Sequence, residues 1–105
     1  MKFGLKESTI DKVNSVFLNH LEIDEVIVYG SRAKGNFREG SDIDLTLIGK
    51  NIKYEKLSKI KQQIDDLNTP YLFDISIFET LKSEDFINHI IRVGQTFYKK
   101  QYLQK

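Results

Sequence analysis

The sequence predicts an α/β fold in which helices pack on one face of a small mixed sheet and the other face forms an open cleft. Short runs rich in β-branched and aromatic residues, which are typical of strands, occur at 26–29, 42–47 and 72–78. Around and between these runs, apolar residues recur at the three- and four-residue spacing of amphipathic helices. Strands that alternate with helices favour this fold class.

The first expected element is a helix that covers one side of the sheet. Its apolar residues recur at helical spacing: Ile10, Val13, Val16 or Phe17, and Leu21. Ser8 or Thr9 can cap its start, because a side-chain hydroxyl there accepts a hydrogen bond from a free backbone N–H group.

A buried strand at 26–29 follows and ends in a glycine-serine turn. Gly30 lets the backbone approach phosphate oxygens closely, since it has no Cβ, and Ser31 adds a hydroxyl donor. Residues 31–34 can open a helical turn whose unpaired N–H groups favour negative charge. Gly30 and Ser31 are therefore the candidate phosphate-binding residues.

The next strand carries two carboxylates on one face. Asp42 and Asp44 are two residues apart, so they project the same way, while Ile43, Leu45 and Leu47 face the core. Two like charges at this separation repel each other, and a divalent cation between them makes the arrangement favourable. Magnesium prefers hard oxygen ligands of this kind, shared with substrate phosphates.

A second amphipathic helix is expected between this strand and the next. Its apolar stripe is Leu57, Ile60, Ile64 and Leu67, and its exposed face carries Lys53, Lys56, Lys59 and Lys61. The helix should stop at 68–70, because Pro70 disfavours helical geometry in the residue before it.

The strand at 72–78 offers a third carboxylate. Phe73, Ile75 and Ile77 share one face, while Asp74 and Ser76 share the other. If this strand lies beside the Asp42 strand, three carboxylates converge and can hold two magnesium ions, one at the attacking hydroxyl and one at the triphosphate. The alternative for Asp74 alone is a solvated strand residue. A last helix from about Ser83 should bury five residues: Phe86, Ile87, Ile90, Ile91 and Phe97.

Other functional motifs fail at specific positions. Gly30 and Gly35 have Walker A spacing, but 36–37 is Asn-Phe, where Lys and Ser or Thr are needed. A calcium loop starting at Asp42 would need Gly at the position of Leu47. With no Cys and two isolated His, neither a thiolate zinc site nor a Cys-His nucleophile can form. An ordinary glycine turn before a strand with surface aspartates remains the alternative interpretation.

Chain length and net charge limit the number of domains and the classes of binding partner that the sequence allows. The 105 residues predict a single domain spanning 1–105. A net charge of +1 does not indicate the strongly basic surface that is typical of proteins that bind a nucleic-acid backbone. No apolar run approaches the roughly 20 residues needed to span a bilayer, so no membrane association is expected. We expect a cytoplasmic protein, and the absence of Cys agrees with that placement.

Three segments carry a family resemblance: GSRAKG at 30–35, GSDIDL at 40–45 and FDI at 73–75. Over 26–78 the chain resembles the DNA polymerase β-type nucleotidyltransferase superfamily and, more narrowly, its minimal nucleotidyltransferases, the MNT group. The resemblance implies that Gly30 and Ser31 bind the triphosphate. It implies that Asp42 and Asp44 ligate both Mg²⁺ ions, and that Asp74 ligates the catalytic ion and helps deprotonate the acceptor hydroxyl. Phe37 departs from the small or polar residues common in the intervening loop.

The resemblance also implies a reaction and a partner. The expected activity is magnesium-dependent transfer of AMP from ATP to a hydroxyl, with release of pyrophosphate. The expected acceptor is a tyrosine of a helical HEPN-type toxin, which would make this chain the antitoxin. Arg32, next to the phosphate turn, can neutralise triphosphate charge or remain a solvated loop cation. Two alternatives stay open: a non-catalytic antitoxin that occludes its partner, and a nucleotidyltransferase for a small-molecule acceptor such as an aminoglycoside.

Overall fold

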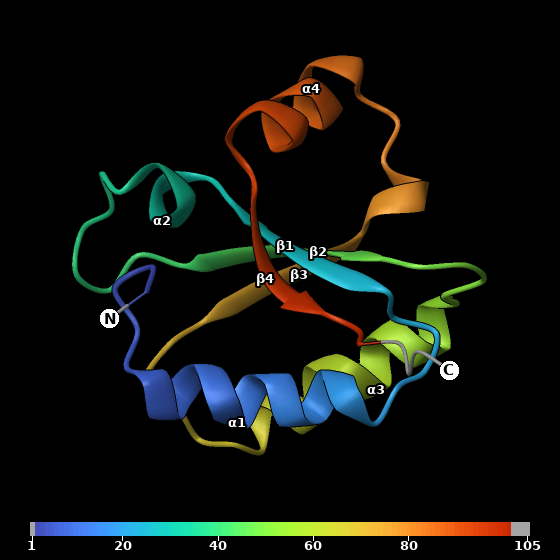
Figure 1. Cartoon of the computed structure of the whole chain (residues 1–105), viewed down its shortest axis with the longest axis horizontal. Helices are drawn as coiled ribbons and strands as arrows, with labels where there is room; N and C mark the ends of the chain where they lie inside the picture. The colour runs from blue at the N-terminus through green and yellow to red at the C-terminus, as the bar shows by residue number, and fades with distance from the viewer. Residues whose placement is uncertain (1, 102–105) are drawn as a thin grey trace.

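A computed structural model describes residues 2–101 of the chain (Figure 1). The helices are α1 (Glu7–Leu18), α2 (Ser31–Lys34), α3 (Tyr54–Asp65) and α4 (Glu84–Val93), and the strands are β1 (Glu25–Tyr29), β2 (Ile43–Ile48), β3 (Phe73–Ile77) and β4 (Gln95–Lys99). A short 3-10 turn, Phe78–Thr80, follows β3. Within the described residues, no helix is both long and apolar enough to cross a membrane.

The strands form one sheet in the order β3-β2-β1-β4. β1 pairs antiparallel with both β2 and β4, whereas β2 pairs parallel with β3, so the predicted mixed sheet is confirmed. Figure 1 shows α1 and α3 on one side of the sheet and α4 on the opposite side. The helical layer is therefore concentrated on one face, and α4 covers part of the other.

The core lies between the sheet and the layer formed by α1 and α3. The strands contribute their apolar faces, including Val26, Val28, Leu45, Leu47 and Ile75, and the helices contribute Val13, Phe17, Ile60 and Ile64. These side chains alternate along the strands with the polar residues of β2 and β3, as the sequence pattern predicted. The opposite face is thereby left with the carboxylates.

The C-terminal region differs from the sequence prediction. α4 ends at Val93, and Phe97 belongs to β4 rather than to the helix. The residues 95–99 pair with β1, and this long-range pairing overrides their weak local preference. α4 fully buries Ile90, whereas Phe86 and Ile91 remain 36% and 69% exposed, because the helix rests on the sheet through a narrow stripe.

Helix boundaries also differ in detail. α1 begins at Glu7 after Lys6 without a side-chain cap, so the expected cap by Ser8 or Thr9 is wrong. Leu21 lies beyond the end of α1 and is 74% exposed. α3 ends at Asp65, before Leu67 and the predicted stop at 68–70.

Candidate active site

Two of the predicted carboxylates lie side by side on neighbouring strands. Asp44 of β2 and Asp74 of β3 are register partners, which confirms the expected adjacency of these strands. Asp42 lies directly before β2, two residues from Asp44, and is exposed like Asp74. Because partners in register share a face of the sheet and positions two apart do too, the three side chains emerge on one side.

Asp44 is the electrostatic centre of this face. Burial raises the pKa of its carboxyl, and the negative charges of Asp74 and Asp42 raise it further. His89 of α4 acts in the opposite direction, which places an imidazole close enough to influence Asp44. The four residues thus form one electrostatically coupled group although they come from three different elements.

Tyr29 connects this group to α4. It is the register partner of Asp44 on β1, and its ring packs edge-on against Phe86 at a centroid distance of 5.4 Å and against His89 at 6.3 Å. Burial raises the pKa of the Tyr29 hydroxyl, a hydrogen bond to Ser76 lowers it, and the charges of Asp44 and Asp74 raise it. Sequence reasoning missed His89, because an isolated histidine in a helix carries no local sign of the strand it faces.

A hydroxyl pair links β2 and β3 next to the carboxylates. Ser76 Oγ donates to Thr46 Oγ1 at 3.0 Å, and Thr46 is fully buried. Thr46 and Ser76 are register partners two residues beyond Asp44 and Asp74. This bond holds the two strands together on the carboxylate face.

The glycine-serine turn lies directly against Asp44. Gly30 has φ +74° and ψ −153°, a conformation that is essentially restricted to glycine. A Cβ added at this position would lie 2.5 Å from Asp44 Oδ2. Gly30 is therefore required both for its backbone conformation and for the close approach of the turn to the carboxylate. Ser31 starts α2, which spans only four residues, so the turn offers local N–H groups rather than the dipole of a long helix.

Arg32 occupies a buried, structural position. Its side chain is 3% exposed, with Nη1 donating to Phe3 O at 3.0 Å and Nη2 donating to Ser41 O at 2.9 Å. Its guanidinium lies 4.5 Å above the centre of the Phe37 ring. This placement does not support the expectation that Arg32 neutralises triphosphate charge, because its donors are directed to the N-terminal segment and the 35–42 loop. It also explains the unusual Phe37, which stacks on the buried cation.

The donor chemistry of the carboxylate face fits Mg²⁺, which prefers carboxylate oxygens and phosphates. Within residues 2–101, however, no three acidic or histidine side chains lie close enough to hold a single ion. The three carboxylates share one face, but their oxygens do not converge as the sequence led us to expect. Like charges repel each other, so a closer approach requires a cation between them.

Comparison with known proteins identifies the sequence family. The sequence family described as "Polymerase beta, Nucleotidyltransferase" matches residues 11–103. Comparison with curated proteins gives no match.

Several solved structures share the fold. A chain of a toxin-antitoxin crystal structure with AMP-PNP has a TM-score of 0.69 and 17% identity, over 92% of this chain and 76% of that chain. A chain of the tri-AMPylated Shewanella oneidensis HEPN toxin in complex with MNT antitoxin has a TM-score of 0.67 and 11% identity, over 91% and 74%. A putative nucleotidyltransferase from Sulfolobus solfataricus has a TM-score of 0.52 and 19% identity, over 92% of both chains.

Proposed function

The chain belongs to the polymerase beta nucleotidyltransferase family, and we propose that it transfers AMP from ATP to a hydroxyl of a partner protein. The observation that carries this proposal is the register pairing of Asp44 with Asp74, with the Gly30 turn against Asp44. A carboxylate pair beside a turn of free N–H groups is suited to hold a triphosphate and to accept a proton next to it.

The proposed roles follow from position. Gly30 and Ser31 hold the triphosphate through backbone and hydroxyl donors. Asp42, Asp44 and Asp74 would hold two Mg²⁺ ions, which when bound neutralise phosphate charge and favour attack. Asp74 is exposed, so an acceptor hydroxyl can reach it and pass its proton to the carboxylate. The acceptor oxygen then forms a bond to the α-phosphorus, the bond from the α-phosphorus to the bridging oxygen breaks, and pyrophosphate leaves.

The partner that we propose is a HEPN-type toxin, with a tyrosine hydroxyl as the acceptor and the cytoplasm as the location. Support comes from the two toxin-antitoxin structures of similar fold, one with AMP-PNP and one containing a tri-AMPylated HEPN toxin. Neutralisation of the partner by AMP transfer would make this chain the antitoxin.

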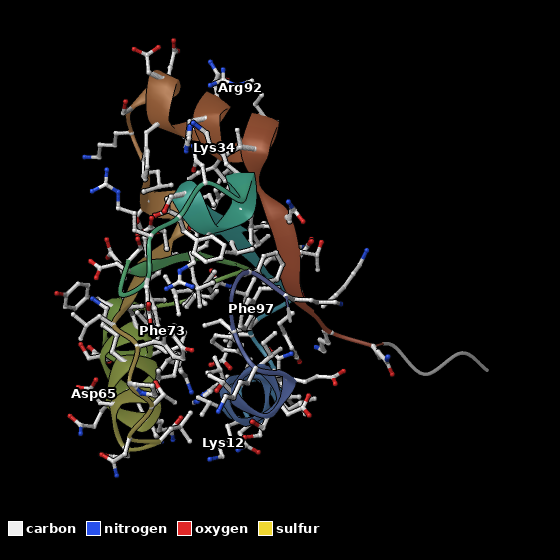
Figure 2. The ribbon with its side chains drawn as sticks, turned by 90° about the vertical axis from the view of Figure 1, so that its left-hand side faces the viewer. Lys12, Lys34, Asp65, Phe73, Arg92 and Phe97 are labelled. Carbon is white, nitrogen blue, oxygen red and sulfur yellow. The ribbon has the colours of Figure 1, made fainter. Side chains whose placement is uncertain are left out.

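A labelling experiment tests the activity. The chain is purified together with a HEPN-type protein encoded beside it, incubated with labelled ATP and Mg²⁺, and the label is located by mass spectrometry. We expect AMP on a tyrosine of the partner, and loss of label with chelator or in Asp44→Asn and Asp74→Asn. Asp65→Asn is the matched control, because Asp65 lies on α3 on the other face of the sheet (Figure 2).

The same variants separate transfer from occlusion. Neutralisation of the partner in cells by a double Asp42→Ala, Asp44→Ala variant would mean that binding is sufficient and transfer dispensable. Absence of label on an intact complex of the unaltered chain would contradict the proposed reaction.

A further inference from the structure

A row of hollows follows the outer edge of β4, which is the last strand of the sheet among residues 2–101. β4 pairs with β1 on one side and forms an edge of the sheet on the other. Hollows of about 590, 420 and 400 Å³ succeed one another along it, the first two sharing Thr96 and the last two sharing Asn14. We call this row the edge groove. β4 lines one side of it, and the other side is lined by the segment 2–4, by α1 and, at one end, by residues of α2 and the loop after it.

Unmet hydrogen-bonding capacity is concentrated in this groove. Within residues 2–101, the buried side-chain atoms without a hydrogen-bond partner are Asn14 Oδ1, His20 Nδ1 and Arg32 Nε. All three residues line the edge groove. His20 and Arg32 are only 4% and 3% exposed. A buried polar atom without a partner costs about 1–3 kcal/mol, and because these three atoms are themselves buried, a ligand can supply the missing partner only where the side chain turns toward the groove.

The unpartnered atoms at the C-terminal end of the groove are hydrogen-bond acceptors. His20 Nε2 lies 2.7 Å from Gln63 Oε1, so Nε2 carries the proton and Nδ1 is an acceptor. Asn14 Oδ1 is a second acceptor in the same hollow. Leu18 and Leu21 beside it are 63% and 74% exposed. A ligand segment with apolar side chains and N–H or O–H groups matches this end.

Charge alternates along the groove and restricts the ligand further. Lys2 and Arg32 line one end, and Lys99 and Lys100 line the other end. Glu7 and Asp11 line the middle, which Lys2 also borders, so the middle carries a net negative charge. A complementary segment is acidic at both ends and basic at its centre.

A second copy of this chain does not fit that pattern. Antiparallel pairing of two β4 strands centred on Phe97 would bring Lys99 of each copy to the cationic end of the other, where like charges destabilise pairing. The side chain of Phe97 lies between β4 and α1 (Figure 2) and contacts Phe17.

We propose that the edge groove binds an extended segment of a partner protein, which adds to β4 as a further strand and carries acidic ends and a basic centre. Lys100 N donates to Asp24 O at 2.9 Å, toward β1. Since hydrogen-bonding direction alternates along a strand, Lys99 directs its backbone groups to the open edge, where a new strand can pair. β1 separates β4 from β2 and β3, which carry the carboxylates, whereas the Arg32 end of the groove belongs to α2, directly after the Gly30 turn.

Synthetic peptides test the proposal on the full chain. One peptide alternates valine and tyrosine, with glutamates at both ends and a lysine at the centre, and a second peptide exchanges the charges. By fluorescence anisotropy at low salt, we expect the first to bind about tenfold more tightly, because each charge pair contributes modestly. Lys99→Gln should weaken its binding about threefold. Lys12→Gln removes the same charge on the side of α1 away from β4 (Figure 2) and should not.

Several outcomes would overturn the proposal. They are equal affinity for the two peptides, no effect of Lys99→Gln in a variant that keeps its unfolding midpoint, and a stable dimer by light scattering that blocks the peptide. A shift of the Lys99 amide resonance on peptide addition would support strand pairing. Asp74→Asn should bind the peptide normally, so failure of this proposal is distinguishable from failure of the proposed transferase function.

Discussion

Replacing Gly30 by alanine tests the close approach of the turn to Asp44. The conformation at φ +74° and ψ −153° costs an L-residue about 1–3 kcal/mol. The new Cβ also lies 2.5 Å from Asp44 Oδ2, so the carboxylate must move, which adds about 1 kcal/mol. We expect Gly30→Ala to lower the free energy of unfolding by about 3 kcal/mol, which corresponds to about 12 °C or more in Tm for a domain of this size.

Two further variants separate the backbone effect from the contact. Gly35 also has positive φ, +85°, but a Cβ there meets no atom within 4 Å, so Gly35→Ala should cost about 1 kcal/mol. Adding Asp44→Ala to Gly30→Ala removes the overlap but not the backbone strain, and should recover about 1 kcal/mol relative to the sum of the single changes.

Urea unfolding followed by circular dichroism measures these free energies. If Gly30→Ala and Gly35→Ala unfold within about 0.5 kcal/mol of each other, the argument from the Asp44 contact is refuted. Additivity of the Gly30 and Asp44 changes would refute it as well.

Three other variants probe the site and its supports. Burial and neighbouring carboxylates raise the pKa of folded Asp44, so the folded state holds this proton more tightly, and the contribution of this group to stability is lost as pH rises above about 4. Asp44→Asn should therefore gain stability relative to the wild type in that window, and an unchanged difference across pH would contradict this. Arg32→Met should lower the free energy of unfolding, measured by urea unfolding, by about 2 kcal/mol, because the carbonyl oxygens of Phe3 and Ser41 lose their hydrogen-bond donors. A decrease below about 0.5 kcal/mol would argue against a structural role of Arg32. Ser83→Ala should lower the free energy of unfolding by about 1 kcal/mol, measured by thermal unfolding, because the Ser83 side chain caps α4. As a control, Ser58→Ala on the exposed face of α3 should lower it little.

The carboxylate face could be predicted from sequence because strand alternation is a local property. The pattern around Asp42, Asp44 and Asp74 fixes which residues share a face, and the parallel pairing of β2 with β3 then brings Asp44 and Asp74 into register. The steric reason for Gly30 is only partly local, since its contact with Asp44 depends on the pairing of β1 with β2.

The sequence-based predictions differ from the structure where contacts between distant parts of the chain determine the conformation. The segment 95–99 becomes a strand through pairing with β1, which lies about seventy residues earlier in the chain and leaves no local periodic signal. The direction of the Arg32 side chain is set by carbonyls of Phe3 and Ser41, and neither is identifiable from sequence spacing. His89 lies beside Tyr29, the register partner of Asp44, only because α4 packs against β1.

The position of β1 inside the sheet has a consequence during biosynthesis. β1 emerges early from the ribosome, yet its second neighbour, β4, is translated roughly seventy residues later, several seconds at typical elongation rates. Until then one side of β1 presents unpaired backbone groups, the type of edge that recruits other chains. Nascent chains of this protein should therefore depend on chaperones or on a nearby binding partner until Gln95–Lys99 completes the sheet.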